Sequence, residues 1–137
     1  IHGWAAQRTR GSRRGHRCEH VGVDDLDALP LTLYKRWVLR PGVTPEDVRD
    51  VVVTLILPAY RRLSGDVSLG LEIDNEHRSI VAVQRWASRE RHRMVTTGAD
   101  YERWWAGYAP LLDEWDRLVE FDDEWSTVVV GLGDGGG

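Results

Sequence analysis

The chain has 137 residues, of which 42% are hydrophobic and 29% are charged, and its formal net charge at pH 7 is −4. These values are typical of one soluble globular domain, and no apolar run approaches the roughly 20 residues of a membrane-spanning helix. The acid excess argues against nucleic acid as the main partner. The single cysteine, Cys18, excludes an internal disulfide and a multi-cysteine metal site, which indicates a reducing, cytoplasmic location.

The two ends of the chain differ in composition from the middle. Residues 1–29 are rich in Arg, Gly, His and Ser and then acidic, with no hydrophobic period, so we expect a disordered basic extension. This extension is either an arm for nucleic acid or an upstream segment with no role. We expect residues 131–137 to form a flexible glycine-rich tail. Residues 30–130 are then the folded domain.

The folded domain is expected to begin with a strand and a helix. Residues 31–40 alternate in polarity, which predicts a strand. The residues on its apolar side are Leu31, Leu33, Trp37 and Leu39. Thr44 is a candidate helix N-cap before Pro45 and two acids, and an apolar face continues from there to residue 63. Pro58 predicts a kink or a junction within this helix.

A hairpin, a second helical region and a last strand are expected next. Strands are predicted over 67–73 and 79–86, joined by a loop over 74–78. A helix over 89–96 is followed, after a break at 96–100, by a second piece whose aromatic residues recur at helical spacing. Residues 116–130 are predicted to form a long last strand, broken near Asp122 and Asp123.

The resulting order, β-α-β-β-α-β, predicts a ferredoxin-like α+β fold, with helices on one face of an antiparallel four-stranded sheet. The third and last strands read as apolar on both sides. One face of the sheet would therefore leave a large apolar patch in water. We infer that a partner subunit covers it, most simply in a homodimer.

Residues 57–112 carry a resemblance to a known family. A glycine-containing turn at 64–66 precedes the second strand, the third strand ends in "QRWASRE" at 84–90, and an aromatic helix leads to a Leu-Leu pair. This pattern resembles the antibiotic biosynthesis monooxygenase family of the dimeric α+β barrel superfamily. The resemblance implies that fold, but the superfamily includes polyketide oxygenases, haem-degrading enzymes, isomerases and proteins with no known chemistry.

The resemblance to the cofactor-independent oxygenases, which oxidise anthrone-type aromatics with O₂, implies particular site residues. Trp86 matches their tryptophan. Their asparagine falls on Ala82, which cannot bind a substrate oxygen, and a tyrosine falls on His92, which can still transfer a proton near neutral pH. Haem degradation is not predicted, because its axial histidine falls at or beside Trp105 and the helix after Gly98 contains no histidine.

Each aromatic candidate also has a structural interpretation. Trp86 either stacks on a substrate or fills the junction between sheet and helix. His92 is either a base, kept neutral by its cationic neighbours, or part of a solvated helix face. Three further aromatic residues share one helix face, which is either core or the wall of a cleft. They are Tyr101, Trp104 and Tyr108.

The remaining polar candidates are Tyr34, Arg36 and Arg85. His92 or Tyr34 is the expected base, and Arg85 the expected stabiliser of a substrate anion. The predicted catalytic residues are thus His92, Trp86, Arg85 and Tyr34, and the predicted substrate-binding residues are Arg36, Tyr101, Trp104 and Tyr108. No metal or cofactor is expected.

Two functions follow from these residues. The first is a cofactor-independent monooxygenase-like activity that uses O₂ on a small aromatic substrate of the polyketide or quinol type. The alternative is a non-catalytic dimer that binds a small molecule or has only a structural role. Ala82, at the asparagine position, favours the second.

Overall fold

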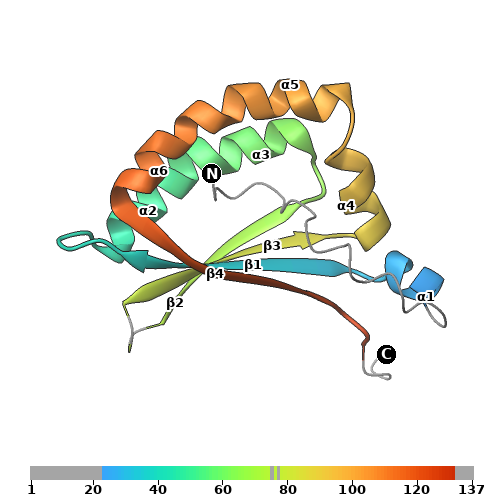
Figure 1. Cartoon of the computed structure of the whole chain (residues 1–137), viewed down its shortest axis with the longest axis horizontal. Helices are drawn as coiled ribbons and strands as arrows, with labels where there is room; N and C mark the ends of the chain where they lie inside the picture. The colour runs from blue at the N-terminus through green and yellow to red at the C-terminus, as the bar shows by residue number, and fades with distance from the viewer. Residues whose placement is uncertain (1–22, 75, 77, 132–137) are drawn as a thin grey trace.

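The computed structural model describes residues 23–74, 76 and 78–131. The elements are α1 (Val23–Ala28), β1 (Leu31–Leu39), α2 (Pro45–Val51), η2 (Val52–Ile56), α3 (Leu57–Leu63), β2 (Ser68–Asp74), β3 (Ser79–Trp86), α4 (Arg89–Val95), α5 (Ala99–Tyr108), η3 (Ala109–Leu111), α6 (Leu112–Leu118) and β4 (Val119–Val128). The strands form an antiparallel four-stranded sheet in the order β2-β3-β1-β4, and the helices α2 to α6 arch over one of its faces (Figure 1). The predicted ferredoxin-like α+β fold is confirmed.

β1 is a central strand whose register with both neighbours is set by its alternation of inward and outward residues. Leu31 lies opposite Trp86 of β3 and opposite Val128 of β4. The pairing with β4 shifts between Arg36 and Trp37. The predicted break in the last strand is therefore present as a β-bulge, which bends the strand locally.

The helical region over 45–63 is nearly continuous but changes its pitch. Thr44 forms a capping box with Asp47, as its position before Pro45 predicted. A π-helical segment, η2, then separates α2 from α3, and the Leu57 N–H donates to the carbonyl of Val52 five residues earlier. Pro58 has no N–H to donate, so an interruption of the α-helical pattern is expected close to it.

Two predicted boundaries differ from the structure. Residues 1–22 and 132–137 lie outside the described residues, but helix α1 forms within the segment that we expected to be disordered. Its Asp27 carboxylate pairs with the guanidinium groups of Arg89 and Arg93, at 3.1 Å and 3.2 Å. These are tertiary contacts with α4, which no local pattern in the extension indicates.

The last strand also begins later than predicted, because α6 continues to Leu118. Pro110 stands in the first turn of η3, where its missing N–H costs no helical hydrogen bond. It therefore starts a new helical turn instead of ending the helical region. Leu112 and Trp115, three residues apart, bury their side chains from α6 against the sheet.

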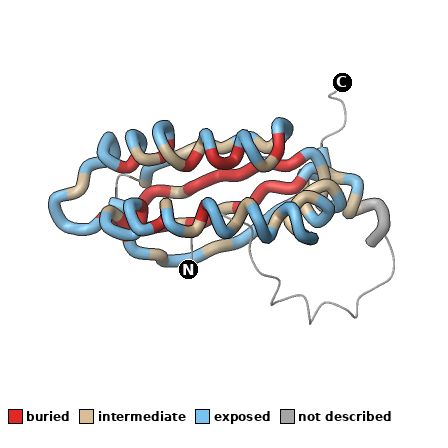
Figure 2. Tube along the Cα trace, turned by 90° about the horizontal axis from the view of Figure 1, so that it is seen from above, coloured by how far each residue is buried: buried red, intermediate tan, exposed pale blue. Residues whose placement is uncertain are grey.

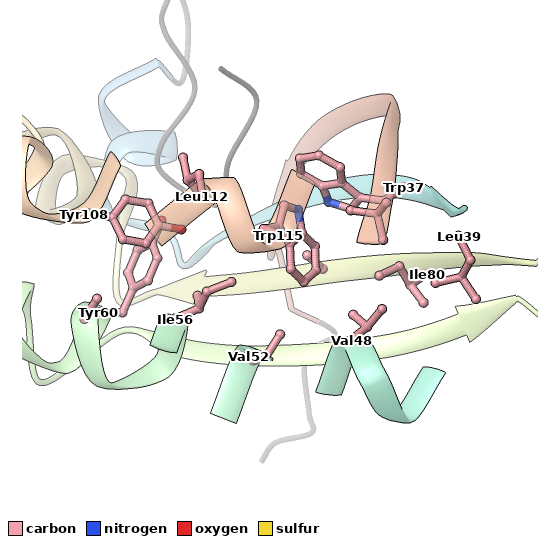
Figure 3. Packing of buried hydrophobic residues seen from close by; sticks show 13 residues of the cluster. Trp37, Leu39, Val48, Val52, Ile56, Tyr60, Ile80, Tyr108, Leu112 and Trp115 are labelled. Carbon is pink, nitrogen blue, oxygen red and sulfur yellow. The ribbon is translucent and has the colours of Figure 1, made fainter. Parts of the chain in front are cut away.

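The buried side chains lie between the helices and the sheet, in two clusters. Figure 2 shows the buried stretches along the central strands, flanked by helices whose outer sides are exposed. The larger cluster is shown in Figure 3 and contains Trp37, Leu39, Val48, Val52, Ile56, Ala59, Tyr60, Ile80, Ala82, Tyr108, Leu112, Trp115 and Val119. The smaller cluster contains Leu31, Leu33 and Trp86.

No helix of the described residues covers the opposite face of the sheet (Figure 1). On this open face the rings of Tyr34 and Trp125 stack with their centroids 5.2 Å apart. The Arg36 guanidinium lies over the Trp125 ring, and its Nε is 2.8 Å from the Asp122 carboxylate. The prediction that β4 is apolar on both sides is therefore wrong, because its open side mixes an aromatic ring with carboxylates.

Candidate functional site

A strip of polar side chains crosses the helix-facing side of the sheet between the two apolar clusters. It consists of Gln84 of β3, Lys35 of β1 and Glu124 of β4. On β1, Leu33 belongs to the smaller cluster and Trp37 to the larger one, and Lys35 lies between them on the same side. Glu124 is the register partner of Lys35 on β4. The strip is thus where a ligand beneath the helices would meet charged and hydrogen-bonding groups.

Gln84 connects the strip to the helices and to Trp86. Its amide oxygen accepts a hydrogen bond from the Trp86 indole, and its amide nitrogen donates to the Tyr60 hydroxyl at 3.3 Å. Both Gln84 and Tyr60 are buried, and burial raises the pKa of Tyr60 well above its usual value. Tyr60 therefore keeps its proton. In the oxygenases of the resemblance, an asparagine occupies the position of Ala82. In this chain the amide of Gln84 lies two residues further along, on the same side of β3.

Lys35 and Glu124 form the charged part of the strip. The Lys35 Nζ lies 3.6 Å from the Glu124 Oε1. The two partners differ in solvation, since 10% of the Lys35 side chain is exposed and 34% of the Glu124 side chain. Burial lowers the pKa of Lys35, and the nearby Glu124 carboxylate opposes this effect.

His92 and Trp86 lie at one end of the strip. Ser88 caps α4 by accepting from the Arg91 N–H, which places His92 one turn into the helix above β3. The His92 ring meets the Trp86 indole edge to face, with centroids 5.1 Å apart. Its Nε2 is buried and has no hydrogen-bond partner among the described residues. Burial, and secondarily the charge of Arg93, lowers the pKa of His92 to about 4.

His92 is consequently neutral at physiological pH, in the form of a base. The direction predicted for its pKa is confirmed, although burial and not the cationic neighbours is the main cause. The alternative, a fully solvated position on the helix surface, is wrong, because the ring packs on Trp86. Trp86 itself is 2% exposed and fills the junction between β3 and α4.

The aromatic residues of α5 form a stack, as their spacing predicted. The centroids of Tyr101 and Trp104 are 5.7 Å apart, and those of Trp104 and Tyr108 are 4.7 Å apart. The Trp104 indole N–H donates to the carbonyl of Ala59 at 2.8 Å, which ties α5 to α3. Tyr108 is buried against Tyr60, as Figure 3 shows. The stack therefore forms part of the packing between the helices.

Three of the predicted site residues lie on the other face of the sheet. Arg85 stands between Gln84 and Trp86, whose side chains are both buried beneath the helices, so its own exposed side chain points to the open face. Tyr34 and Arg36 lie on that face too, next to Trp125. The structure thus separates these residues from His92. Within one chain, Arg85 therefore cannot stabilise the substrate anion that forms when His92 removes a proton.

Lys35, Gln84, Tyr60 and Glu124 were not predicted as site residues. The sequence does contain a signal for Lys35, because a lysine occupies the apolar side of an alternating strand, between Leu33 and Trp37. A charged residue at an inward position indicates a paired or functional group. Glu124 carries no such signal, because the bulge in β4 changes which side its residues face.

Within the described residues, no group of three or more His, Cys, Asp or Glu side chains is placed to hold a metal ion. In the same part of the chain, no helix has both the length and the apolar character needed to cross a membrane.

Solved structures share this fold, although no protein-family model and no curated protein matches the chain. SnoaB, a cofactor-independent oxygenase from Streptomyces nogalater, matches 77% of this chain and 98% of its own, with 15% identity and a TM-score of 0.55. A NIPSNAP family protein from Agrobacterium tumefaciens matches 85% of this chain and 92% of its own, with 9% identity and a TM-score of 0.52.

An antibiotic biosynthesis monooxygenase-like protein from Chloroflexus aurantiacus matches 77% of this chain and 97% of its own, with 20% identity and a TM-score of 0.45. At such identities a likeness shows the fold alone. This chain therefore has the ferredoxin-like α+β fold that SnoaB and the NIPSNAP protein share, as the resemblance to the antibiotic biosynthesis monooxygenase family predicted.

Proposed function

We propose that this protein is a cofactor-independent oxygenase that acts on a small aromatic substrate of the polyketide or quinol type. The observation that carries the proposal is the pairing of Trp86 with His92, whose Nε2 is buried, neutral and without a partner in the described residues. A neutral imidazole with an unpaired ring nitrogen can accept a proton from a substrate, although its lowered pKa makes it a weaker base than an exposed histidine. The likeness to SnoaB supports a fold that can host this chemistry.

In this reaction the substrate itself supplies the electrons. His92 takes a proton from an activated C–H group, and the resulting carbanion reacts with O₂. For an anthrone-type methylene, the balanced products are a carbonyl group and water. The protein contributes the base and a neighbouring aromatic ring in Trp86. Arg85 and Tyr34 have no part in this scheme.

The competing function is a non-catalytic dimer that binds a small molecule or serves only as a structural unit. A specific observation favours it: the aromatic residues of α5 are engaged with each other and with α3. The Trp104 indole donates to Ala59, and Tyr108 is buried against Tyr60. Such a stripe functions as core packing with or without a ligand.

Oxygen uptake with dithranol as substrate distinguishes the two functions. We expect a rate above the uncatalysed background, which falls by about a hundredfold or more in His92→Leu because general-base catalysis contributes on this order. Arg85→Gln is the matched control. It is expected to retain the rate, because Arg85 stands next to Trp86 in β3 but points to the open face. A rate at background for the parent protein, with tryptophan fluorescence still quenched by dithranol, would instead establish the binding function.

We also propose that the protein is a homodimer that pairs through the open face of the sheet. The Tyr34 and Trp125 stack lies on this face, and 37% of Trp125 remains exposed. An exposed aromatic ring on a sheet face that no helix covers is typical of an interface. Light scattering at micromolar concentration is expected to give twice the chain mass, and Trp125→Glu is expected to give a monomer. A monomer mass for the parent protein would contradict this.

A further inference from the structure

A buried lysine in the interior of a small domain is uncommon, and Lys35 is the only lysine of the 137-residue sequence. Lys35 lies on the helix-facing side of β1, where the other residues of that strand are apolar, and is 8% exposed. A lysine that served only as a solvated charge would gain nothing from this position, because desolvation of an ammonium group is costly.

We propose that Lys35 is the nucleophilic amine of a binding site for small carbonyl compounds, with which it condenses to an imine beside Glu124. The ligand class is an aldehyde or ketone on a small conjugated or aromatic frame, because the apolar side chains of Leu33 and Trp37 flank the amine. The proposal does not rest on oxygenase activity, since it concerns a different group and a different reaction.

The condensation balances without an oxidant or reductant. The lone pair of the neutral Nζ attacks the carbonyl carbon and forms the new C–N bond. The two protons that the nitrogen loses pass to the carbonyl oxygen, which leaves as water while the C=O bond is replaced by a C=N bond. The Glu124 Oε1, 3.6 Å from the Nζ, is placed to accept and return one of these protons.

Access and protonation both fit this role. β4 is an edge strand of the sheet, and the partly exposed Glu124 side chain connects the amine to solvent along that edge. Burial also lowers the pKa of Lys35. A lower pKa leaves a larger neutral fraction of an amine at pH 7, so more of Lys35 is in its nucleophilic form in the folded chain than in the unfolded chain.

The test is reductive trapping at pH 7 with 2-hydroxy-1-naphthaldehyde and cyanoborohydride, followed by peptide mapping by mass spectrometry. Arg62→Lys provides the matched control, because it adds one amine at an exposed position of α3, away from the open face of the sheet. We expect the adduct to form faster on Lys35 than on the introduced amine, because burial leaves a larger fraction of Lys35 neutral. We also expect Lys35 to react more slowly once the chain is unfolded in urea.

The dependence on aldehyde concentration separates a binding site from a merely reactive amine. Saturation of the Lys35 rate shows that the aldehyde binds before it condenses, whereas a linear dependence would overturn the binding site. Equal or slower labelling of Lys35 than of the amine introduced by Arg62→Lys would overturn the proposal as a whole. Because the adduct is detected by its mass, its absence would leave the result of the dithranol assay unaffected.

Discussion

Replacement of His92 by leucine tests whether the imidazole is buried in its neutral form. In the folded chain its pKa is lowered from 6.5 to about 4, mainly by burial against Trp86. In the unfolded chain it returns to about 6.5. Between these two values the unfolded chain binds a proton that the folded chain does not. Acidification therefore favours the unfolded state, and His92→Leu removes this contribution.

The size of the effect follows from the two pKa values. At pH 5 the unfolded histidine is almost fully protonated and the folded one almost fully neutral, which corresponds to about 2 kcal/mol of stability lost relative to pH 8. Water reaches the exposed part of the ring and reduces this value, so we expect about 1–2 kcal/mol. The stability is fully present above pH 6.5 and declines as the pH falls towards 4.

Urea denaturation at pH 8, 6 and 5 measures this difference. The carboxylates of the chain also titrate in acid, so the relevant quantity is the stability of the parent protein minus that of His92→Leu at each pH. Met94→Leu is the matched control, because Met94 lies two residues further along α4 and is 61% exposed. Parallel pH profiles for the parent and His92→Leu would refute a neutral, buried imidazole.

Three further substitutions and one control test the packing, the helix cap and the buried lysine through the free energy of unfolding. Trp115→Ala is expected to cost about 3–5 kcal/mol, because the ring is fully buried in the larger cluster, whereas Val53→Ala, at a half-exposed position, is expected to cost less than about 1 kcal/mol. Thr44→Ala removes the capping box and is expected to cost about 1 kcal/mol; no change would show that the cap contributes nothing. Lys35→Met is expected to stabilise the chain by about 1 kcal/mol at pH 7, since it removes a desolvated amine while Glu124 keeps its contact with water, and a large loss would contradict this account.

Much of the fold could be predicted from local patterns. The apolar run in residues 79–86 predicted β3 with its observed bounds, and Thr44 with Pro45 marked the start of the first long helix. Pro58 marked the region where the helix changes its pitch. These features depend on backbone geometry and on which side chains leave water, so a short stretch of sequence is sufficient to reveal them.

Part of the candidate site could also be predicted, because the shared face of Tyr101, Trp104 and Tyr108 follows from helical spacing alone. The prediction that Arg85 belongs to the same site as His92 is wrong. Strict alternation next to Trp86 was sufficient to place Arg85 on the other side of β3. The depth at which His92 lies was not predictable, because it depends on how α4 packs on the end of β3.

The sequence by itself therefore determined the order of the elements, the cap of the first long helix and the inward side of β1. Only the tertiary structure decided that Asp27 of α1 pairs with α4, that the bulge in β4 turns Glu124 towards Lys35, and that Gln84 joins Tyr60 to Trp86. Local patterns arise from neighbours a few residues apart. The polar strip instead joins residues from three strands and contacts Tyr60 of a helix. Its ion pair and hydrogen bonds form only when long-range packing brings these residues together.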